Sequence, residues 1–186
     1  MTRQLALLRG INVGGRSRVP MKELVAAMEG QGFTNVSTYL QTGNILFESD
    51  ETDPSALAIR LQELIAGQFG TTTPVILRTP EQLGQVSSGH PYLDDEDAPA
   101  KLHVMFLDHE AGPSDIVELD PDRSPGDRFV VEGQEIYLHY PNGAGRSKLT
   151  TDYFERRLGV TATARNWNTV LKLQSMMADR AGSSGE

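Results

Sequence analysis

Two short glycine-rich stretches contain the residue types that bind anions. NVGGRSRV spans residues 12–19, and NGAGRSKL spans residues 142–149. Both place asparagine, glycine, arginine, serine, a second base and an aliphatic residue at the same spacing. Glycines let backbone N–H groups turn towards a ligand, and the start of a following helix adds partial positive charge. The repeated pattern therefore indicates sites for a phosphate or a carboxylate.

The candidate anion-binding residues are the glycines of these loops and the polar or basic side chains around them. They are Arg9, Asn12, Gly14, Gly15, Arg16, Asn142, Gly143, Gly145, Arg146, Ser147 and Lys148. We expect Ser147 to donate its hydroxyl at the start of the next helix. The spacing of a Walker phosphate-binding loop is missing. The alternative is a tight turn with an N-cap serine, whose bases pair with a neighbouring acidic loop.

A third candidate is TARNWNT, residues 163–169, where the last strand passes into the last helix. Arg165, Asn166, Trp167 and Asn168 offer a guanidinium, two amides and a flat apolar ring, which could hold an anion or a base-like ring. The alternative is that Trp167 anchors the core and that one of the asparagines is the N-cap of the helix.

Other polar residues give weaker signals. Asn44 is included among the candidate ligand residues, although turn chemistry at the tip of a hairpin explains it better. The four histidines are scattered without metal-ligand spacing, so we expect no metal site. No motif identifies a cofactor or a catalytic residue, and both stay unknown.

The charge distribution limits the function classes. The chain of 186 residues has a formal net charge of -8, and residues 90–135 hold 13 acidic but three basic side chains. A uniformly basic nucleic-acid surface is excluded, whereas local basic sites are not. No apolar run is long enough to span a membrane, and cysteine is absent, which removes disulfides and thiolate chemistry. We expect a cytoplasmic protein with no membrane partner.

Hydrophobic periodicity predicts the same order of elements twice. In the first half, strands are predicted at residues 4–11, 36–41, 44–49 and 73–79, with helices at 21–29, 54–69 and after Pro80. In the second half, strands are predicted at residues 102–108, 128–133, 135–141 and 160–167, with helices at 113–119, 147–158 and a last one that follows. A polar, turn-rich stretch separates the halves.

The fold class expected from this order is α+β, with two tandem ferredoxin-like subdomains, each βαββαβ plus an extra helix. Residues 1–88 would form the first subdomain, 89–100 an acidic linker and 101–186 the second. FESDETDPSAL (residues 47–57) also matches FLDHEAGPSDI (residues 106–116) without gaps. We expect the first and third strands of each sheet to be parallel neighbours, which would bring one basic and one acidic loop to the same edge.

Four stretches together resemble a known bacterial family. They are LLRGINVGGRSRVPMKEL, GFTNVSTYLQTGNILFES, IYLHYPNGAGRSKLT and TARNWNTVLKL. The chain resembles the domain-of-unknown-function family number sixteen ninety-seven over nearly its whole length. The resemblance implies two similar α+β subdomains. It implies no reaction and no catalytic residue.

Three functions remain open at this point. The first is a small binding protein or enzyme for a phosphate-bearing, nucleotide-like ligand, gathered by the basic loops in a shared cleft. The second is an RNA or single-stranded DNA binding protein, which is disfavoured because few aromatic residues interrupt the first and third strands. The third is a structural or partner-binding module in which the motifs serve packing.

Overall fold

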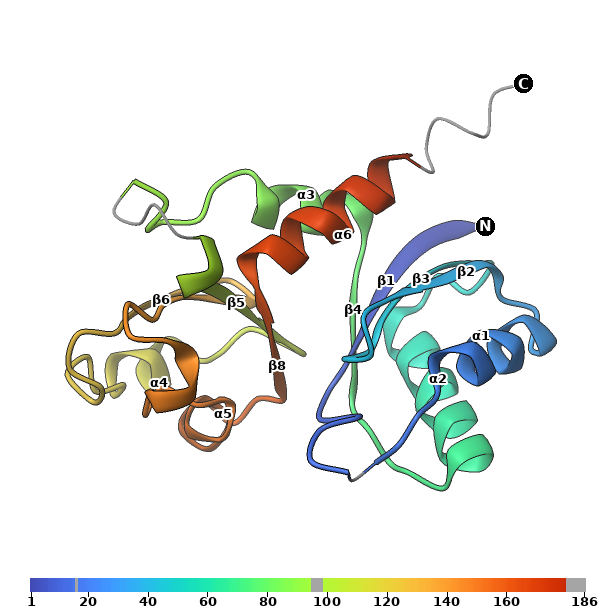
Figure 1. The fold of residues 1–186 in the computed structure, drawn as a ribbon, viewed down its shortest axis with the longest axis horizontal. Coiled ribbons are helices and arrows are strands. Elements are labelled where there is room, and N and C mark those ends of the chain that lie inside the picture. The colour runs from blue at the N-terminus through green and yellow to red at the C-terminus, as the bar shows by residue number, and fades with distance from the viewer. Residues whose placement is uncertain (16, 95–98, 180–186) are drawn as a thin grey trace. The chain divides into compact units, whose positions relative to one another are not determined.

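The described part of the chain forms two four-stranded antiparallel sheets and six α-helices (Figure 1). The structure is a computed structural model, and it describes residues 1–15, 17–94 and 99–179. The chain divides into two compact units. The first comprises Met1–Leu83 together with the end of the chain from Ser175, and the second comprises Gly84–Gln174.

The first unit begins with alternating strands and helices. Its elements are β1 (Thr2–Leu8), α1 (Met21–Gly30), β2 (Thr34–Tyr39), β3 (Asn44–Ser49), α2 (Pro54–Phe69), β4 (Val75–Arg78) and the start of α3 (Pro80–Ser87). The strand order in the sheet is β2-β3-β1-β4, and all neighbours are antiparallel. Helices α1 and α2 lie side by side against one face of this sheet (Figure 1).

Alternation along β1 decides which side chains meet these helices. Ala6 and Leu8 belong to the core formed with α1 and α2, whereas Leu5 and Leu7 are buried on the other face of the sheet. Buried aliphatic side chains on α2 recur every four residues, as a helix packed on one side requires. Phe47 meets this core with its ring edge-on to another aromatic ring.

Helix α2 begins and ends at the residues that its sequence indicates. The Asp53 carboxylate accepts a hydrogen bond from Ser55 N over 3.0 Å, and Pro54 fills the first helical position. Gly70 ends the helix in the left-handed conformation, with φ of 65°. The predicted helix over residues 54–69 is therefore confirmed.

The second unit repeats the order of the first. Its elements are η1 (Pro99–Lys101), β5 (Leu102–Leu107), α4 (Pro113–Val117), β6 (Arg128–Glu132), β7 (Glu135–His139), η2 (Ala144–Arg146), α5 (Thr151–Leu158), β8 (Ala162–Asn166) and most of α6 (Trp167–Asp179). The strand order is β6-β7-β5-β8, again antiparallel throughout. The core on the helix side contains Met105, Ile136, Leu138 and Phe154.

The expected pairing of parallel neighbours is wrong. β1 pairs with β3 antiparallel, with Leu5 opposite Leu46, and β5 pairs with β7 in the same way. Antiparallel neighbours leave their carboxyl ends at opposite edges of a sheet. The basic loop after β1 and the acidic loop after β3 therefore emerge at opposite ends of the sheet, and the prediction of a shared edge fails.

Two further stretches differ from what the sequence predicts. Helix α5 begins at Thr151 rather than at residue 147, because the Thr150 hydroxyl accepts from Tyr153 N and caps the helix. The end of α6 belongs to the first unit, where Arg3 donates to Met177 O over 2.9 Å. No helix within the described residues combines the length and the apolar character that crossing a membrane requires.

Candidate functional site

The first basic loop is closed by the side chain of Asn12. Its amide donates to Val19 O over 3.0 Å and to Gln41 O over 2.7 Å, and its oxygen accepts from Val19 N over 2.9 Å. Asn12 N also donates to Ser17 O, and the residue adopts a φ of 54°. Asparagine tolerates this conformation better than most residues do. The amide therefore joins the loop to itself and to the turn after β2, and its hydrogen-bonding capacity is used within the protein.

We expect Asn12→Ala to lower the free energy of unfolding by about 2 kcal/mol, because three hydrogen bonds are lost and alanine disfavours positive φ. Urea denaturation measures this change. Asn142→Ala is the matched control, since Asn142 holds the equivalent place in the second motif but is exposed. The control should change stability by less than about 0.5 kcal/mol. Equal effects of the two substitutions would contradict the structural role of Asn12.

The other candidates of the first loop have mixed positions. Gly14 and Gly15 are exposed and have positive φ, of 62° and 75°. The backbone of Arg9 is paired with the two residues that precede β4: its N–H donates to Pro74 O, and its carbonyl accepts from the Thr73 hydroxyl. Arg16 lies outside the described residues, so its predicted role stays a prediction.

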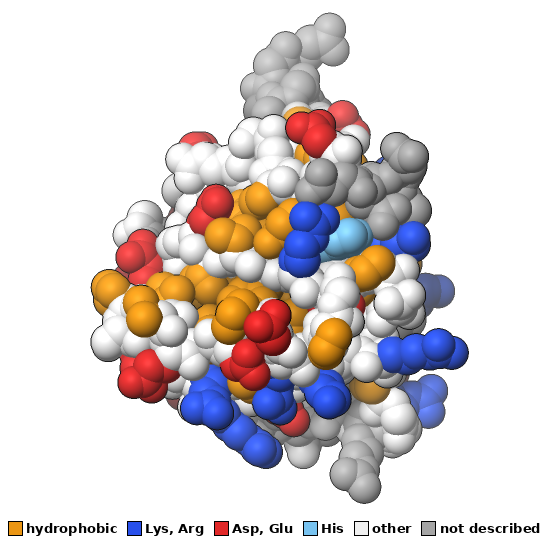
Figure 2. Space-filling model, turned by 90° about the vertical axis from the view of Figure 1, so that its left-hand side faces the viewer, with side chains coloured by type: hydrophobic (Ala, Val, Ile, Leu, Met, Phe, Trp, Pro, Cys, Tyr) orange, Lys and Arg blue, Asp and Glu red, His pale blue; other side chains and the backbone are white. Residues whose placement is uncertain are grey.

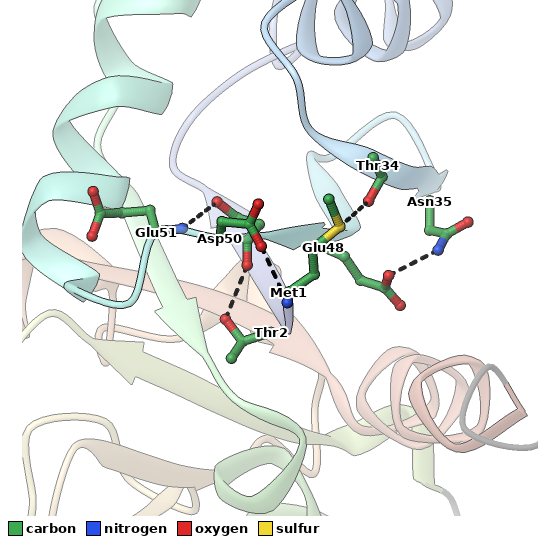
Figure 3. Close-up of polar contacts among 8 residues, drawn as sticks. Met1, Thr2, Thr34, Asn35, Glu48, Asp50 and Glu51 are labelled. Atoms are coloured by element: carbon green, nitrogen blue, oxygen red, sulfur yellow. Dashed lines mark hydrogen bonds and ion pairs between the residues drawn. The ribbon is translucent and has the colours of Figure 1, made fainter. Parts of the chain in front are cut away.

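Two carboxylates, one near the end of β3 and one in the acidic loop that follows it, lie close to the start of the chain (Figure 3). The Asp50 carboxylate lies 3.1 Å from the amino group of Met1. Glu48 pairs with Arg3 at 3.3 Å and accepts from the Asn35 amide over 2.8 Å. These carboxylates thus serve the ends of β1 and β2, which is a different role from pairing with the basic loop.

The second loop is held by bonds within its own backbone. Gly143, with φ of 86°, donates its N–H to Tyr140 O, and Arg146 and Ser147 donate theirs within the short helix η2. Ser147 does not begin α5; its hydroxyl accepts from Leu149 N over 2.9 Å. In this loop the Gly143 N–H is therefore used within the protein, and the predicted role of the glycines in binding an anion stays a prediction.

Ser124 and Arg123, which are not among the residues predicted from the sequence, support this loop. Both lie more than 20 residues before Lys148 in the chain. The Ser124 hydroxyl accepts from Lys148 N over 3.1 Å and donates to Asp127 over 2.6 Å. Arg123 donates to Lys148 O over 3.1 Å, and its guanidinium lies 4.2 Å from the centre of the Tyr153 ring. Arg146 and Lys148 are exposed. The backbone of Lys148 is thus held from both sides, and Arg146 lies two residues before it in the chain.

The TARNWNT candidates are part of the packing. Trp167 is 2% exposed, which confirms that it anchors the core. The Asn166 oxygen accepts from Asn168 N over 3.0 Å at the start of α6, and the Asn166 amide donates to Ala100 O over 2.8 Å. Asn166 therefore caps the helix, as the alternative interpretation held. Asn168 itself is exposed.

Arg165 is a buried cation on β8. It donates to the Thr163 hydroxyl over 2.7 Å and to Ala164 O over 2.8 Å. Burial lowers the pKa of Arg165 to about 10, because the charged form loses hydration. The side chain still carries its charge at neutral pH. At 7% exposure it offers little surface to a dissolved ligand.

Asn44 is fully buried and closes the turn between β2 and β3. Its amide donates to Tyr39 O over 2.7 Å and lies 3.2 Å from the Thr42 hydroxyl. This is the turn chemistry that the sequence also indicated. Within the residues that the structure describes, no group of three or more histidine, aspartate or glutamate side chains is placed to hold a metal ion.

Comparison with known proteins identifies the family. A family model described as "Protein of unknown function (DUF1697)" matches residues 1–137. The chain belongs to this family. The DUF1697 assignment confirms the resemblance seen in the sequence. No curated protein matches the chain.

One solved structure resembles this DUF1697 protein along almost its whole length. It is described as a conserved bacterial protein, SP0830, from Streptococcus pneumoniae, with 23% identity and a TM-score of 0.74. The match covers 96% of this chain and 99% of that chain. At this identity the likeness shows a shared fold.

Proposed function

We propose that this DUF1697 protein binds a small phosphate-bearing or otherwise anionic ligand at the second basic loop. The observation that carries the proposal is the support of the loop by two distant residues: Ser124 accepts from the backbone N–H of Lys148, and Arg123 donates to its carbonyl. Lys148 and Arg146 are exposed, and the backbone of Lys148 makes both hydrogen bonds without a ligand. A preorganised loop loses less conformational entropy on binding than a mobile one.

Arg123 adds to this surface in a defined position. Its stacking on Tyr153 restricts the guanidinium, while the planar fork keeps N–H groups that match phosphate oxygens. Exposed cations contribute modestly because water screens them, so we expect affinity for inorganic phosphate or a nucleotide on the order of 0.1–1 mM. The nearby Asp127 is engaged by Ser124 and limits the net positive charge.

Calorimetric titration with inorganic phosphate, AMP and ATP tests the proposal. The double variant Arg146→Ala, Lys148→Ala should weaken binding at least about tenfold, since each charge-assisted hydrogen bond contributes roughly 1.5 kcal/mol. The control is Arg156→Ala, Arg157→Ala, which removes the same charge from exposed positions on α5. No binding by the wild type, or equal weakening in both variants, would overturn the proposal.

Nucleic-acid binding across the second sheet has less support. Proteins that bind RNA on such a sheet stack bases on exposed aromatic rings. Tyr137 is 6% exposed, and burial raises its pKa to about 12. Tyr140 is also buried, with its hydroxyl donating to Leu149 O over 2.9 Å. A stacking platform would need these rings in contact with solvent.

We also infer that the two units are copies of one ferredoxin-like unit, with subdomain limits near residues 88 and 101. The equal strand orders support this inference, and so does the register of two buried arginines. Arg78 lies opposite Leu5 on β1, and Arg165 lies opposite Val104 on β5. Each arginine is at most 7% exposed and donates to the carbonyl of the residue before it.

A further inference from the structure

Strand β6 lies at the outer end of the second sheet. In the described part of the chain it pairs with β7 alone, so its other side is an edge. Its sequence is RFVVE, with exposed charged residues at both ends and three half-buried apolar residues between them. An apolar edge strand is a template for pairing with another strand.

The hydrogen bonds of the central strands show which backbone groups of β7 face which neighbour. Leu107 N donates to Gln134 O over 2.8 Å, and Tyr140 N donates to Lys101 O over 2.9 Å. The even-numbered residues from 134 to 140 therefore face β5. Because the direction alternates along a strand, the odd-numbered residues face β6.

The same alternation sets the direction of the backbone on β6. Arg128, Val130 and Glu132 are the residues opposite the odd-numbered positions of β7, so their N–H and C=O groups point inwards. Phe129 and Val131 point theirs outwards, towards the open edge. Phe129 and Val131 thus each present one backbone N–H and one C=O at the open edge. Their spacing is the one that an antiparallel partner strand requires.

The geometry points to a second copy of this chain as the occupant of this edge. A two-fold axis through Val130 places Phe129 opposite Val131 of the second copy, and each such pair exchanges two backbone hydrogen bonds. The same axis places Arg128 opposite Glu132 of the second copy, once on each side. Moving the axis by one residue loses both ion pairs. The charge pattern of the strand is therefore complementary to itself in one register.

Apolar surface beside the edge supports the same occupant. Phe129, Val131 and Ile116 are only partly buried where they pack against the core of the second unit. Val117, on α4, is 84% exposed. Figure 2 views the side on which α4 and β6 lie in Figure 1 and shows hydrophobic side chains gathered there, between acidic and basic ones. Because the paired strands are short, the interface is small, and we expect a dissociation constant on the order of 10–100 µM.

Sedimentation equilibrium over a wide range of protein concentrations tests this dimer. In the Glu132→Arg variant, both Arg128–Glu132 ion pairs across the two-fold axis become pairs of arginines. Association should therefore weaken at least about tenfold. In Arg128→Glu, two glutamates face each other, with the same result. An equimolar mixture of the two variants restores both opposite-charge pairs and should associate about as strongly as the wild type.

Two controls separate the interface from general effects. Glu63→Arg makes the same charge change at an exposed position on α2 and should leave association within about twofold of the wild type. Circular dichroism must show both β6 variants folded, because Arg128 also contacts His139 and stacks 4.4 Å from the centre of the Tyr92 ring. A wild type that stays monomeric at about 500 µM, at least about five times the expected constant, or a mixture no stronger than either variant alone, would overturn the proposal.

Discussion

Replacing Gly43 by alanine should lower the free energy of unfolding by about 3–5 kcal/mol, the largest effect expected of a single methyl group in this protein. A Cβ at this position would lie 2.7 Å from the Cβ of Leu8 and 2.8 Å from the Cδ1 of Ile11. Gly43 O also accepts from Leu8 N over 2.8 Å, so the turn cannot withdraw without losing that bond. Its φ of 83° adds the cost of a conformation that alanine disfavours.

A second glycine separates the steric clash from the cost of a positive φ. Gly70 has φ of 65° at the end of α2, but nothing lies within 4 Å of a Cβ built there. Gly70→Ala should therefore show the conformational cost alone, about 1 kcal/mol. Urea denaturation of both variants gives the difference, which measures the close approach to Leu8. If the two variants lose equal stability, the contact with β1 contributes nothing and the explanation fails.

The regular elements could be predicted from the sequence because local pattern and tertiary packing agree. Buried apolar residues recur at helical spacing on α2, which packs on one side, whereas β1 and β3 are short apolar runs that are buried on both faces. The turn at Gly43 was predictable for a different reason: its residues allow few other conformations. The relative direction of neighbouring strands is set by the connections between them. The expectation that the first and third strands would be parallel did not follow from those connections.

The loops show what a residue pattern does not determine. Asn12 and Asn142 begin similar stretches, yet Asn12 closes its loop with three hydrogen bonds and Asn142 is exposed. The difference comes from residues that are distant in the sequence. Asn12 donates a hydrogen bond to Gln41 O, whereas the second loop is held by the hydrogen bond from Lys148 N to Ser124. Such partners have no signature within the loop itself. The motif therefore predicted the position of basic residues, but neither their support nor the role of the asparagine.

The candidate ligand residues predicted from the sequence also differ in their burial. Arg165 and Trp167 are both nearly inaccessible, whereas Arg146 and Lys148 are exposed. An arginine near the end of a strand is usually exposed, so only the packed structure reveals that Arg165 is in the interior. The proposed site therefore uses the exposed residues of the second loop, and the roles of the first-loop candidates stay predictions. Its strongest added member, Arg123, follows an acidic stretch that gave no sign of a ligand.

His90 makes the stability of the second unit sensitive to acid. Its Nε2 lies 3.0 Å from His103 O, and its Nδ1 accepts from Tyr92 N over 3.3 Å. These partners require the neutral ring with its proton on Nε2, because a carbonyl accepts and a backbone N–H donates. A second proton would lie on Nδ1 and face the N–H of Tyr92. Protonation therefore removes a hydrogen bond and places two donors against each other.

The surroundings of His90 also oppose a positive charge. Burial is the main cause that lowers the pKa of His90, and the neighbouring His139 lowers it further. Burial lowers the pKa of His103 as well, with a smaller contribution from His90. Arg128, the charged group beside His139, adds no negative charge to offset this. The rings of Tyr137 and Trp167 each lie 5.2 Å from that of His90 and cannot replace the lost hydration.

The direction of the pH effect follows from these lowered pKa values. Below the unfolded-state pKa of about 6.5, the unfolded chain takes up protons that the folded chain excludes, so stability falls with falling pH. Each histidine contributes a slope of up to about 1.4 kcal/mol per pH unit between its unfolded and folded pKa values. Together, His90 and His103 should make the protein markedly less stable at pH 5.5 than at pH 7.5. Urea denaturation at a series of pH values measures the slope.

The only tryptophan reports on His90 directly. Trp167 contacts the His90 ring edge-on, and a protonated imidazole quenches indole fluorescence. Because the folded chain takes up this proton only near its lowered pKa, emission should fall at a lower pH than the pH at which stability begins to fall. His90→Gln should remove the quenching step and roughly half of the slope, leaving the part due to His103. His109→Gln, at an exposed position beside Asp108, should change neither. A wild-type slope that survives in His90→Gln would assign the acid sensitivity to other groups, because the buried ring at residue 90 would then exchange its proton without cost to the fold.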